Sequence, residues 1–398
     1  MYTIVKKLST ILLCASILLN LSCNLSASED ADYSNSTKGT QNIDKIFSHI
    51  NENCGKFEEA ATDFILSTQS VKINNILVLD DEIYLPAEQL FTSLQGSINK
   101  NLIIIDKESI NLKFINNSRI VVVNDIPQVT SLPPVKVDGS LFIPSKSLSE
   151  ALGLAIELNK AKDAVYINKK YNIPVKNNLE KLFPERKVKG ELRISANLYD
   201  SVGGKRIKTL DSLSVVEVER DVDYKWYMVK DASGVTGWIA ANTLDIDSDY
   251  KTNSDTATKE EIEFFINYKG FTSKTQYLVW VDLSRQKINL MKRNNNSWSL
   301  YKTFSCATGK NISPTVKGEF EIKPERGMWM YAHDGIKVKY FVRFFESYYF
   351  HSILLNSNGS INNPSLGKPM SKGCIRMSLD NAEWFYNNVP QGTKVFIN

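Results

Sequence analysis

Apolar and polar positions alternate along much of the chain, which predicts a protein built mainly from β-strands. The alternation is clearest in the last third, where we expect the strands Tyr277–Asp282, Lys287–Met291, Trp298–Phe304 and Gly318–Ile322. Helical spacing appears in shorter stretches, such as Leu379–Asn387. The pattern is typical of a multidomain, mainly β fold.

An internal repeat lies between residues 68 and 170. The segment IYLPAEQLFTSLQG from Ile83 resembles LFIPSKSLSEALGL from Leu141, and Pro86 recurs as Pro144. Each copy predicts a strand, a proline at a helix start and a short helix. This α+β repeat domain resembles the N-terminal domain of copper amine oxidases. It contains no His or Cys, so the resemblance implies no copper and favours a structural or wall-contact role.

Residues 187–247 change to short strands separated by turns. Strands are expected at Trp226–Lys230 and Gly237–Ile239, and Gly203-Gly204 is typical of a turn. The segment resembles a bacterial SH3-type β-barrel, a family that tends to bind cell-wall peptides. The alternative is that the two tryptophans of these strands only fill the core of a small barrel.

The N-terminus has the features of an export signal. Lys6 and Lys7 precede the apolar run Leu8–Leu21, and Leu25-Ser26-Ala27 resembles a cleavage site. We therefore predict a signal peptide or membrane anchor over residues 1–27, and Cys23 raises lipoprotein processing as a further option.

Amino-acid composition predicts the remaining domain boundaries. Residues 28–67 read as a polar spacer with one amphipathic helix at Asp44–Leu66, and residues 248–275 as a linker with a helical patch at Lys259–Tyr268. Residues 276–398 form the last, β-rich domain. A chain of 398 residues is long enough for two or three such domains.

Charge excludes one class of partner. The chain carries 48 Lys and Arg against 44 Asp and Glu, interspersed, with a net charge of +4. It has no basic block or stripe of the kind that nucleic-acid binding needs. Nothing in this distribution selects an oligomeric state.

The cysteines leave a free thiol. After removal of residues 1–27 the chain keeps Cys54, Cys306 and Cys374, an odd number that cannot pair completely. Cys374 follows a glycine and lies between Lys372 and Arg376, which is a poor setting for an apolar filler. Cys306 lies in a strand, where we expect it to be packed and inert.

A histidine in the same domain suits this thiol. A thiol attacks as its thiolate, and an imidazole base can take its proton. His351 ends the aromatic strand that begins at Tyr348, whereas His49 and His333 have no evident partner in the sequence. Before Cys374, Gly373 supplies backbone freedom for an oxyanion site.

These residues resemble the catalytic domain of L,D-transpeptidases of the YkuD type. His351-Ser352 followed by SKGCIRM at Ser371–Met377 matches the family's H-[GS] … [ST]-x-G-C-x-[RN] pattern. CATGK at Cys306 and the T-x-x-G-E-F run from Thr315 resemble its upstream strands. Lys372 stands where many members have histidine, Val316 replaces a proline, and a polar stretch at Asn356–Asn363 lengthens the interval.

The resemblance assigns roles. Cys374 would be the nucleophile, His351 the general base and acid, and the Ser352 backbone carbonyl would orient the imidazole. The N–H of Gly373 would belong to an oxyanion hole. Three further residues would contact substrate: Ser371, Lys372 and Arg376. For Arg376 the alternative is a structural role, in which it holds the turn together.

The reaction implied is acyl transfer between peptidoglycan stem peptides, giving 3→3 crosslinks through a cysteine thioester, outside the cytoplasm and without a cofactor or metal. Two alternatives stay open. With water as acceptor the enzyme would be an L,D-carboxypeptidase, and with an inactive last domain the chain would be a non-enzymatic cell-wall-binding protein. Membrane anchoring would depend on the N-terminal segment.

Overall fold

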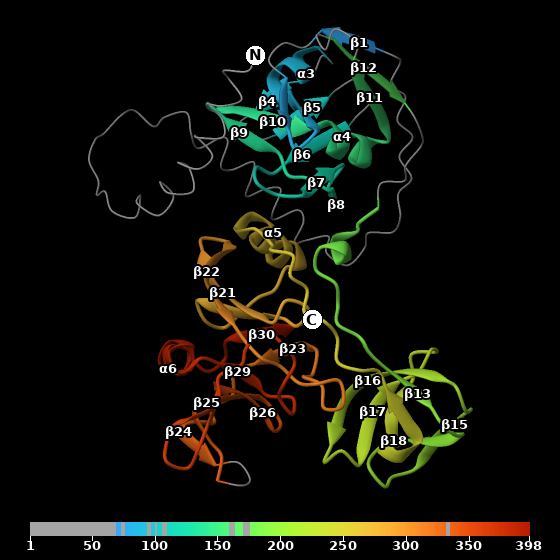
Figure 1. The fold of residues 1–398 in the computed structure, drawn as a ribbon, viewed down its shortest axis with the longest axis vertical. Coiled ribbons are helices and arrows are strands. Elements are labelled where there is room, and N and C mark those ends of the chain that lie inside the picture. The colour runs from blue at the N-terminus through green and yellow to red at the C-terminus, as the bar shows by residue number, and fades with distance from the viewer. Residues whose placement is uncertain are drawn as a thin grey trace. The chain divides into compact units, whose positions relative to one another are not determined.

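The computed structural model describes residues 69–72, 76–93, 97–99, 102–105, 110–158, 164–169, 176–331 and 335–398, all within one compact unit, Phe47–Asn398 (Figure 1). The expected signal or anchor, the spacer with its helix, His49, Cys54 and His333 lie outside these residues. Within the described ranges, no helix is long and apolar enough to cross a membrane.

The two copies of the repeat pair with each other. In the first copy β3 (Glu82–Pro86) leads into α3 (Ala87–Ser93), and in the second β10 (Ser140–Pro144) leads into α4 (Ser145–Leu152). β3 and β10 are antiparallel neighbours, with Leu85 opposite Ile143. Both side chains are fully buried, so each copy covers the apolar face that the other leaves open.

Three sheets make up this first domain. Their orders are β1-β12-β11, β2-β3-β10-β9 and β4-β5-β6-β7-β8. The strands not yet bounded are β1 (Gln69–Lys72), β2 (Leu77–Leu79), β4 (Ser97–Asn99), β5 (Leu102–Ile105), β6 (Ile110–Phe114), β7 (Ile120–Val123), β8 (Ile126–Val129), β9 (Val135–Val137), β11 (Leu154–Leu158) and β12 (Ala164–Lys169).

A second domain follows the short 3-10 helix η1 (Leu179–Lys181). Its seven strands form one antiparallel sheet in the order β15-β14-β18-β17-β16-β13-β19, and we call it the β13–β19 domain. It has its own core of alternating side chains, such as Leu198, Val229 and Ile239. The strands are β13 (Val188–Leu192), β14 (Ala196–Tyr199), β15 (Arg206–Leu210), β16 (Val215–Val222), β17 (Trp226–Lys230), β18 (Thr236–Ala240) and β19 (Leu244–Ile246), with η2 (Ala241–Thr243) before the last.

Two sheets with one shared core form the C-terminal domain. The first has the order β22-β21-β20-β30-β23, and β30 runs parallel to β20 although the two lie at opposite ends of the domain's sequence. Val279 and Val395 are paired there and fully buried. The strands are β20 (Tyr277–Asp282), β21 (Lys287–Asn294), β22 (Ser297–Ser305), β23 (Gly318–Glu321) and β30 (Lys394–Ile397).

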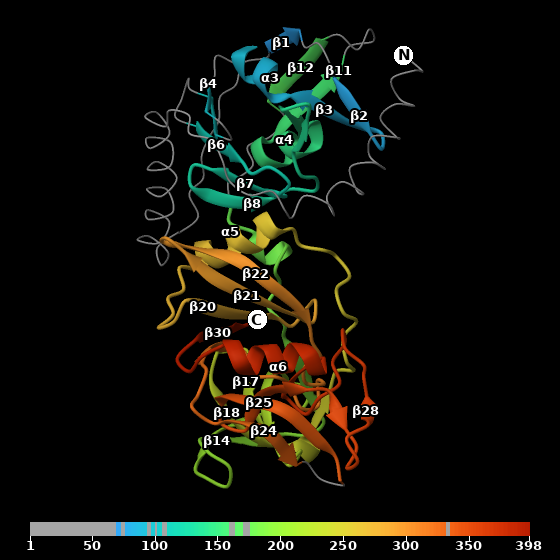
Figure 2. The same ribbon diagram turned by 90° about the vertical axis from the view of Figure 1, so that its left-hand side faces the viewer.

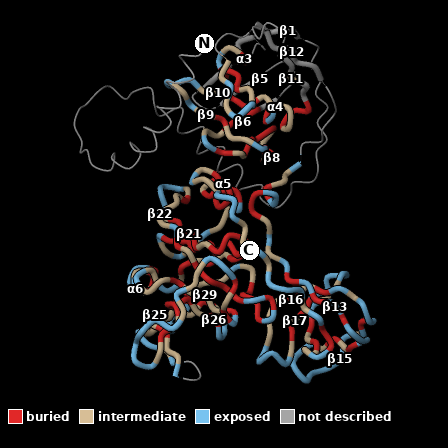
Figure 3. The backbone as a smooth tube through the Cα atoms, viewed as in Figure 1, coloured by how far each residue is buried: buried red, intermediate tan, exposed pale blue. Residues whose placement is uncertain are grey.

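The second sheet has the order β28-β27-β25-β26-β29, with β24 paired to β25. α6 (Leu379–Asn388) begins after the cap Ser378 and packs on β25 and β26 (Figure 2). In this contact the Phe385 ring stacks on the Phe350 ring, with the ring centres 4.7 Å apart. The strands are β24 (Arg326–Tyr331), β25 (Lys337–Phe345), β26 (Tyr348–Ser352), β27 (Leu354–Leu355), β28 (Ile361–Asn363) and β29 (Ile375–Met377). Buried positions run between the two sheets (Figure 3).

The segment expected to be a linker contains α5 (Lys259–Lys269), and this helix is packed. The Phe265 ring lies 4.9 Å from that of Trp280 on β20, and the Asn267 side chain bonds both backbone groups of Trp298 on β22. The helical patch predicted at Lys259–Tyr268 is thus a helix whose buried face covers the first sheet of the C-terminal domain, and only this packing was not anticipated.

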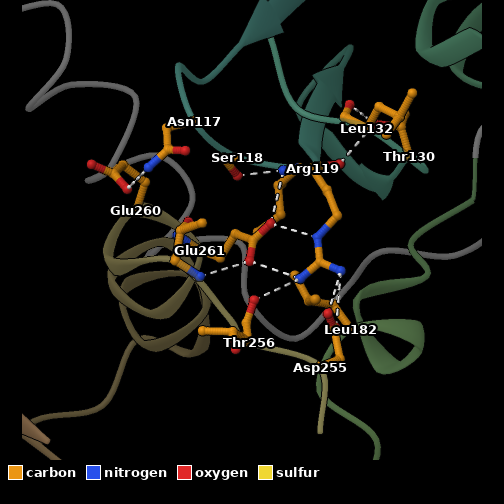
Figure 4. Close-up of polar contacts among 12 residues, drawn as sticks. Asn117, Ser118, Arg119, Thr130, Leu132, Leu182, Asp255, Thr256, Glu260 and Glu261 are labelled. Carbon is orange, nitrogen blue, oxygen red and sulfur yellow. Dashed lines mark hydrogen bonds and ion pairs between the residues drawn. The ribbon is translucent and has the colours of Figure 1, made fainter. Parts of the chain in front are cut away.

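Arg119 joins the first domain to this helix (Figure 4). Its backbone N–H and Nε both lie 2.9 Å from Oε1 of Glu261, and its Nη1 lies 2.9 Å from Oδ2 of Asp255. Glu261 is fully buried and closes the capping box of α5 with Thr258. These hydrogen bonds raise the pKa of Arg119. A second arginine, Arg285, donates to the same Oδ2 of Asp255 from its Nη2 at 3.3 Å.

We predict that Arg119→Ala lowers the free energy of unfolding by about 3 kcal/mol, because it leaves the buried Glu261 carboxylate without its cation. Urea denaturation measures the change. The control is Arg193→Ala, which breaks the exposed Arg193–Asp245 pair and should leave the curve nearly unchanged. Equal free energies of unfolding for the two variants would show that the contacts of Arg119 do not stabilise the fold.

Candidate active site

Parallel pairing of β26 with β29 places His351 opposite Arg376. Their neighbours Phe350 and Ile375 are fully buried in the core between the sheets. Because side chains alternate along a strand, His351 and Arg376 lie on the other face. Cys374 immediately precedes β29 and continues that alternation. The pairing thus gathers three of the sequence-predicted residues on one face of the sheet.

The Cys374 thiol is half-buried. Its Sγ lies 3.7 Å from the carbonyl oxygen of Ser347, and it has a backbone hydrogen bond with Tyr349. Burial raises the pKa of Cys374, whereas the Tyr349 bond and the positive charge of Arg376 act in the opposite direction. The net shift is upward, so the resting side chain is a neutral thiol at neutral pH.

The His351 ring is buried, with 4% of its surface exposed. Its Nδ1 lies 2.6 Å from the carbonyl oxygen of Ser352. A carbonyl can only accept, so Nδ1 carries the proton and Nε2 keeps a free lone pair. Burial lowers the pKa of His351 to about 4, and the nearby Arg376 charge acts in the same direction. The ring is therefore a neutral base.

The turn before Cys374 depends on Gly373, whose φ is +98°. A Cβ at this position would lie 2.5 Å from a ring carbon of Tyr348, so no larger residue fits without movement. The Gly373 N–H donates to Oγ of Ser371 at 3.1 Å, and Ser371 in turn donates to the Cys374 carbonyl. The Gly373 carbonyl accepts from Oγ1 of Thr315 at 2.7 Å.

The three residues expected to bind substrate have different surroundings. Ser371 is buried and its hydroxyl bridges the turn, whereas Lys372 is exposed, with its ammonium 5.4 Å from the centre of the Tyr224 ring. Arg376 is half-buried, and its Nε has no hydrogen-bond partner in the described part of the chain. Their roles toward substrate stay predictions.

Four surrounding residues escaped the sequence analysis as parts of the site. Ser347 and Tyr349 contact the thiol through their backbones, Tyr348 packs beneath Gly373, and Thr315 anchors the turn. Only Thr315 had a signal, as the first residue of the T-x-x-G-E-F run. Backbone contacts leave no mark on residue type, so Ser347 and Tyr349 could not be found in that way, and no local pattern connects the Tyr348 ring with Gly373.

The second described thiol is inert. Cys306 is fully buried in the core of the C-terminal domain, and burial raises its pKa strongly. Among the residues that the structure describes, no three His, Cys, Asp or Glu side chains are grouped to hold a metal ion.

Comparison with known proteins identifies two of the domains. Residues 276–397 match the family model of the L,D-transpeptidase catalytic domain, and residues 66–167 that of the copper amine oxidase N-terminal domain. Residues 276–397 are thus similar to the L,D-transpeptidase catalytic domain. The expected resemblance to both families and the mainly β, multidomain fold are confirmed. The SH3-type barrel over residues 187–247 stays a prediction.

Two Bacillus relatives carry the same family name. A Bacillus subtilis protein, provisionally named L,D-transpeptidase YciB, is 30% identical over 128 residues, and a Bacillus licheniformis protein, provisionally named L,D-transpeptidase YkuD, is 31% identical over 124 residues. Each match covers 30% of this chain and 65% of the relative. The chain therefore spans slightly less than two thirds of these relatives.

A solved structure from Clostridium acetobutylicum is also similar. It is described as a fused Zn-dependent amidase, peptidase and peptidoglycan-binding-domain protein, and it is 28% identical to this chain. The match covers 35% of this chain and 59% of that one, with a TM-score of 0.31.

We predict that iodoacetamide alkylates Cys374 slowly at neutral pH and that the rate keeps rising beyond pH 9. The raised pKa of Cys374 means that the reactive thiolate forms at a higher pH than in an ordinary cysteine. Peptide mass spectrometry gives the rate, with Cys374→Ala as the blank. A plateau between about pH 5 and 8 would instead indicate a thiolate–imidazolium pair.

We also predict that Gly373→Ala is more harmful than Gly359→Ala. Both glycines have positive φ, +98° and +87°, but a Cβ at Gly359 would meet nothing within 4 Å. The two variants share the backbone strain, and only Gly373→Ala adds the clash with Tyr348. Thermal or urea unfolding should give an extra loss of about 2 kcal/mol. Equal losses of unfolding free energy in the two variants would show that backbone strain alone accounts for the effect.

Proposed function

We propose that this protein is a peptidoglycan L,D-transpeptidase that forms 3→3 crosslinks through a thioester on Cys374. The observation that carries the proposal is the pairing of β26 with β29, which sets a neutral His351 base and a half-buried thiol on one face of the sheet. The family match over residues 276–397 supports the same class of reaction.

Acylation is the first half-reaction. As Sγ of Cys374 attacks the carbonyl carbon of the third stem residue, its proton passes to Nε2 of His351. The carbonyl oxygen becomes an oxyanion beside the Gly373 turn. The C–N bond then breaks, the proton returns from His351 to the leaving amine, and D-alanine departs. The thioester remains on Cys374.

The Gly373 N–H needs one adjustment to serve the oxyanion. In the resting turn it donates to Oγ of Ser371, and an N–H can share its hydrogen between two acceptors. A negatively charged oxygen is the stronger acceptor. We therefore assign Ser371 the role of holding this N–H in place until substrate arrives.

The second half-reaction transfers the acyl group. The side-chain amine of a neighbouring stem gives a proton to His351 and attacks the thioester carbon, and Sγ leaves as the thiolate, which His351 then reprotonates. The products are the 3→3 linked peptide and free Cys374. In this scheme the exposed Lys372 and the Arg376 guanidinium are available for stem-peptide carboxylates. Because peptidoglycan lies outside the cytoplasm, the scheme requires export.

We predict that Cys374→Ala abolishes crosslinking and that His351→Asn lowers it at least about a hundredfold, since the thiol then loses its base. The assay incubates the full chain with tetrapeptide muropeptides and separates the products by chromatography and mass spectrometry. The matched control is Cys306→Ala, which removes the buried thiol and should keep the activity.

The products of this assay distinguish the transpeptidase from the carboxypeptidase and from a non-enzymatic wall-binding protein. Tripeptides without 3→3 dimers would replace the proposal with an L,D-carboxypeptidase. Full activity of Cys374→Ala would reject the cysteine mechanism. Binding to peptidoglycan without any change in the muropeptides would favour a non-enzymatic wall-binding protein.

A further inference from the structure

The β13–β19 domain contacts the C-terminal domain next to the candidate nucleophile. Arg220 on β16 forms an ion pair with Glu346, which lies in the turn between β25 and β26. The guanidinium also lies 5.5 Å from the centre of the ring of Phe345, the last residue of β25. The residue after Glu346 is Ser347, whose carbonyl accepts from the Cys374 thiol. Arg220 therefore holds the turn that touches Sγ.

The next residue of β16 holds a second loop. Oδ1 of Asp221 accepts a hydrogen bond of 2.6 Å from Oγ of Ser313, and Ser313 is buried. Nearby, the Tyr227 hydroxyl donates to the carbonyl of Ile312 at 2.9 Å. This loop leads directly to Thr315, which bonds the carbonyl of Gly373. Asp221 therefore fixes the loop that anchors the Cys374 turn from the other side.

The strand β16 is irregular immediately before these two residues. The register of β16 on β17 shifts between Val218 and Arg220, which leaves Glu219 as an extra residue. Bulges of this kind redirect side chains and are frequent next to active sites. The bulge lies at the point where the domain meets the site.

A cavity of about 330 Å³ lies beside the contact, and its lining includes Arg220, Met228, Phe320 and Phe345. Next to the turn, the Phe345 ring packs on Phe320 with the ring centres 5.0 Å apart. The ion pair of Arg220 with Glu346 is a further contact that limits movement of the turn.

From these contacts we propose that the β13–β19 domain is part of the catalytic unit, with Arg220 and Asp221 as positioning residues for Cys374. They act through the turn at Glu346 and the loop at Ser313, and neither touches the reacting atoms. The inference rests on the proposed function in one respect, the role of Cys374 as nucleophile. A domain expected only to bind the cell wall thereby acquires a role in the reaction.

Arg220→Gln in the full chain tests the first contact. We expect crosslinking to fall about tenfold, because a displaced turn misplaces the thiol. At the same time the rate of iodoacetamide alkylation of Cys374 at pH 7.5 should rise about threefold, because the opened turn exposes the thiol. A purely structural role would not move the two rates in opposite directions. The matched control is Arg193→Gln, in an exposed ion pair of the same domain.

A charge exchange makes the test specific. The double variant Arg220→Glu with Glu346→Arg restores the ion pair in reverse, and we expect both rates to return to within about twofold of the wild type. If Arg220→Gln does not fold, Glu346→Gln breaks the same pair from its exposed side and should give the same opposite shifts. Wild-type rates in these single variants, or no rescue in the double variant, would overturn the proposal.

Asp221→Ala tests the second contact. We expect it to lower crosslinking relative to Arg193→Gln, and unchanged crosslinking would remove Asp221 from the proposal.

Alkylation of Cys374 requires no crosslinking activity. The alkylation rate therefore tests the positioning role even if Cys374→Ala retains activity and the proposed function fails. Conversely, a catalytic Cys374 with unaltered alkylation in Glu346→Gln would reject only the positioning role.

Discussion

The parallel pairing of β26 with β29 is the constraint on which the candidate site depends. It places His351 opposite Arg376, on the face of the sheet to which Cys374 also belongs, although β27 and β28 lie between them in the sequence. Phe350 and Ile375 fix the register of β26 on β29, because their side chains are fully buried in the core between the sheets. A slip of one residue would exchange the two faces and bury the reactive groups. The core therefore sets the chemistry as well as the stability.

Burial also sets the resting state of the two reactive groups. It lowers the pKa of His351 and raises that of Cys374, so both shifts favour neutral forms. A neutral thiol reacts slowly with electrophiles, because the thiolate is the nucleophilic form. The ring nitrogen that can accept a proton is Nε2, because Nδ1 donates its hydrogen to the Ser352 carbonyl.

The sequence was most informative where the pattern reflects side chains. Alternation predicted the first four strands of the C-terminal domain within three residues of their observed ends, as in Tyr277–Asp282. The leucine-spaced repeat predicted two strand–helix units, which the structure pairs through β3 and β10. Motif order brought Cys374, His351 and Gly373 together as candidates before any geometry was available.

What the sequence could not supply depends on backbone and on contacts between domains. The carbonyl of Ser347 and the backbone of Tyr349 touch the thiol, and any residue type could do so. The packing of α5 was hidden by its polar surroundings, and the approach of Arg220 to Glu346 joins residues that no local pattern connects. Long-range polar contacts are decided by the assembled fold.

The position of β30 has a consequence for how the molecule reaches its native state. This strand lies between β20 and β23, so the hydrogen bonds of Val279 remain open on one side until Val395 has been synthesised. Closing so long a loop carries an entropy cost that slows folding. While the chain emerges, the edge of β20 that later pairs with β30 is open, and residues 278–281 along it are apolar. The first sheet of the C-terminal domain therefore closes only after nearly the whole domain has been synthesised.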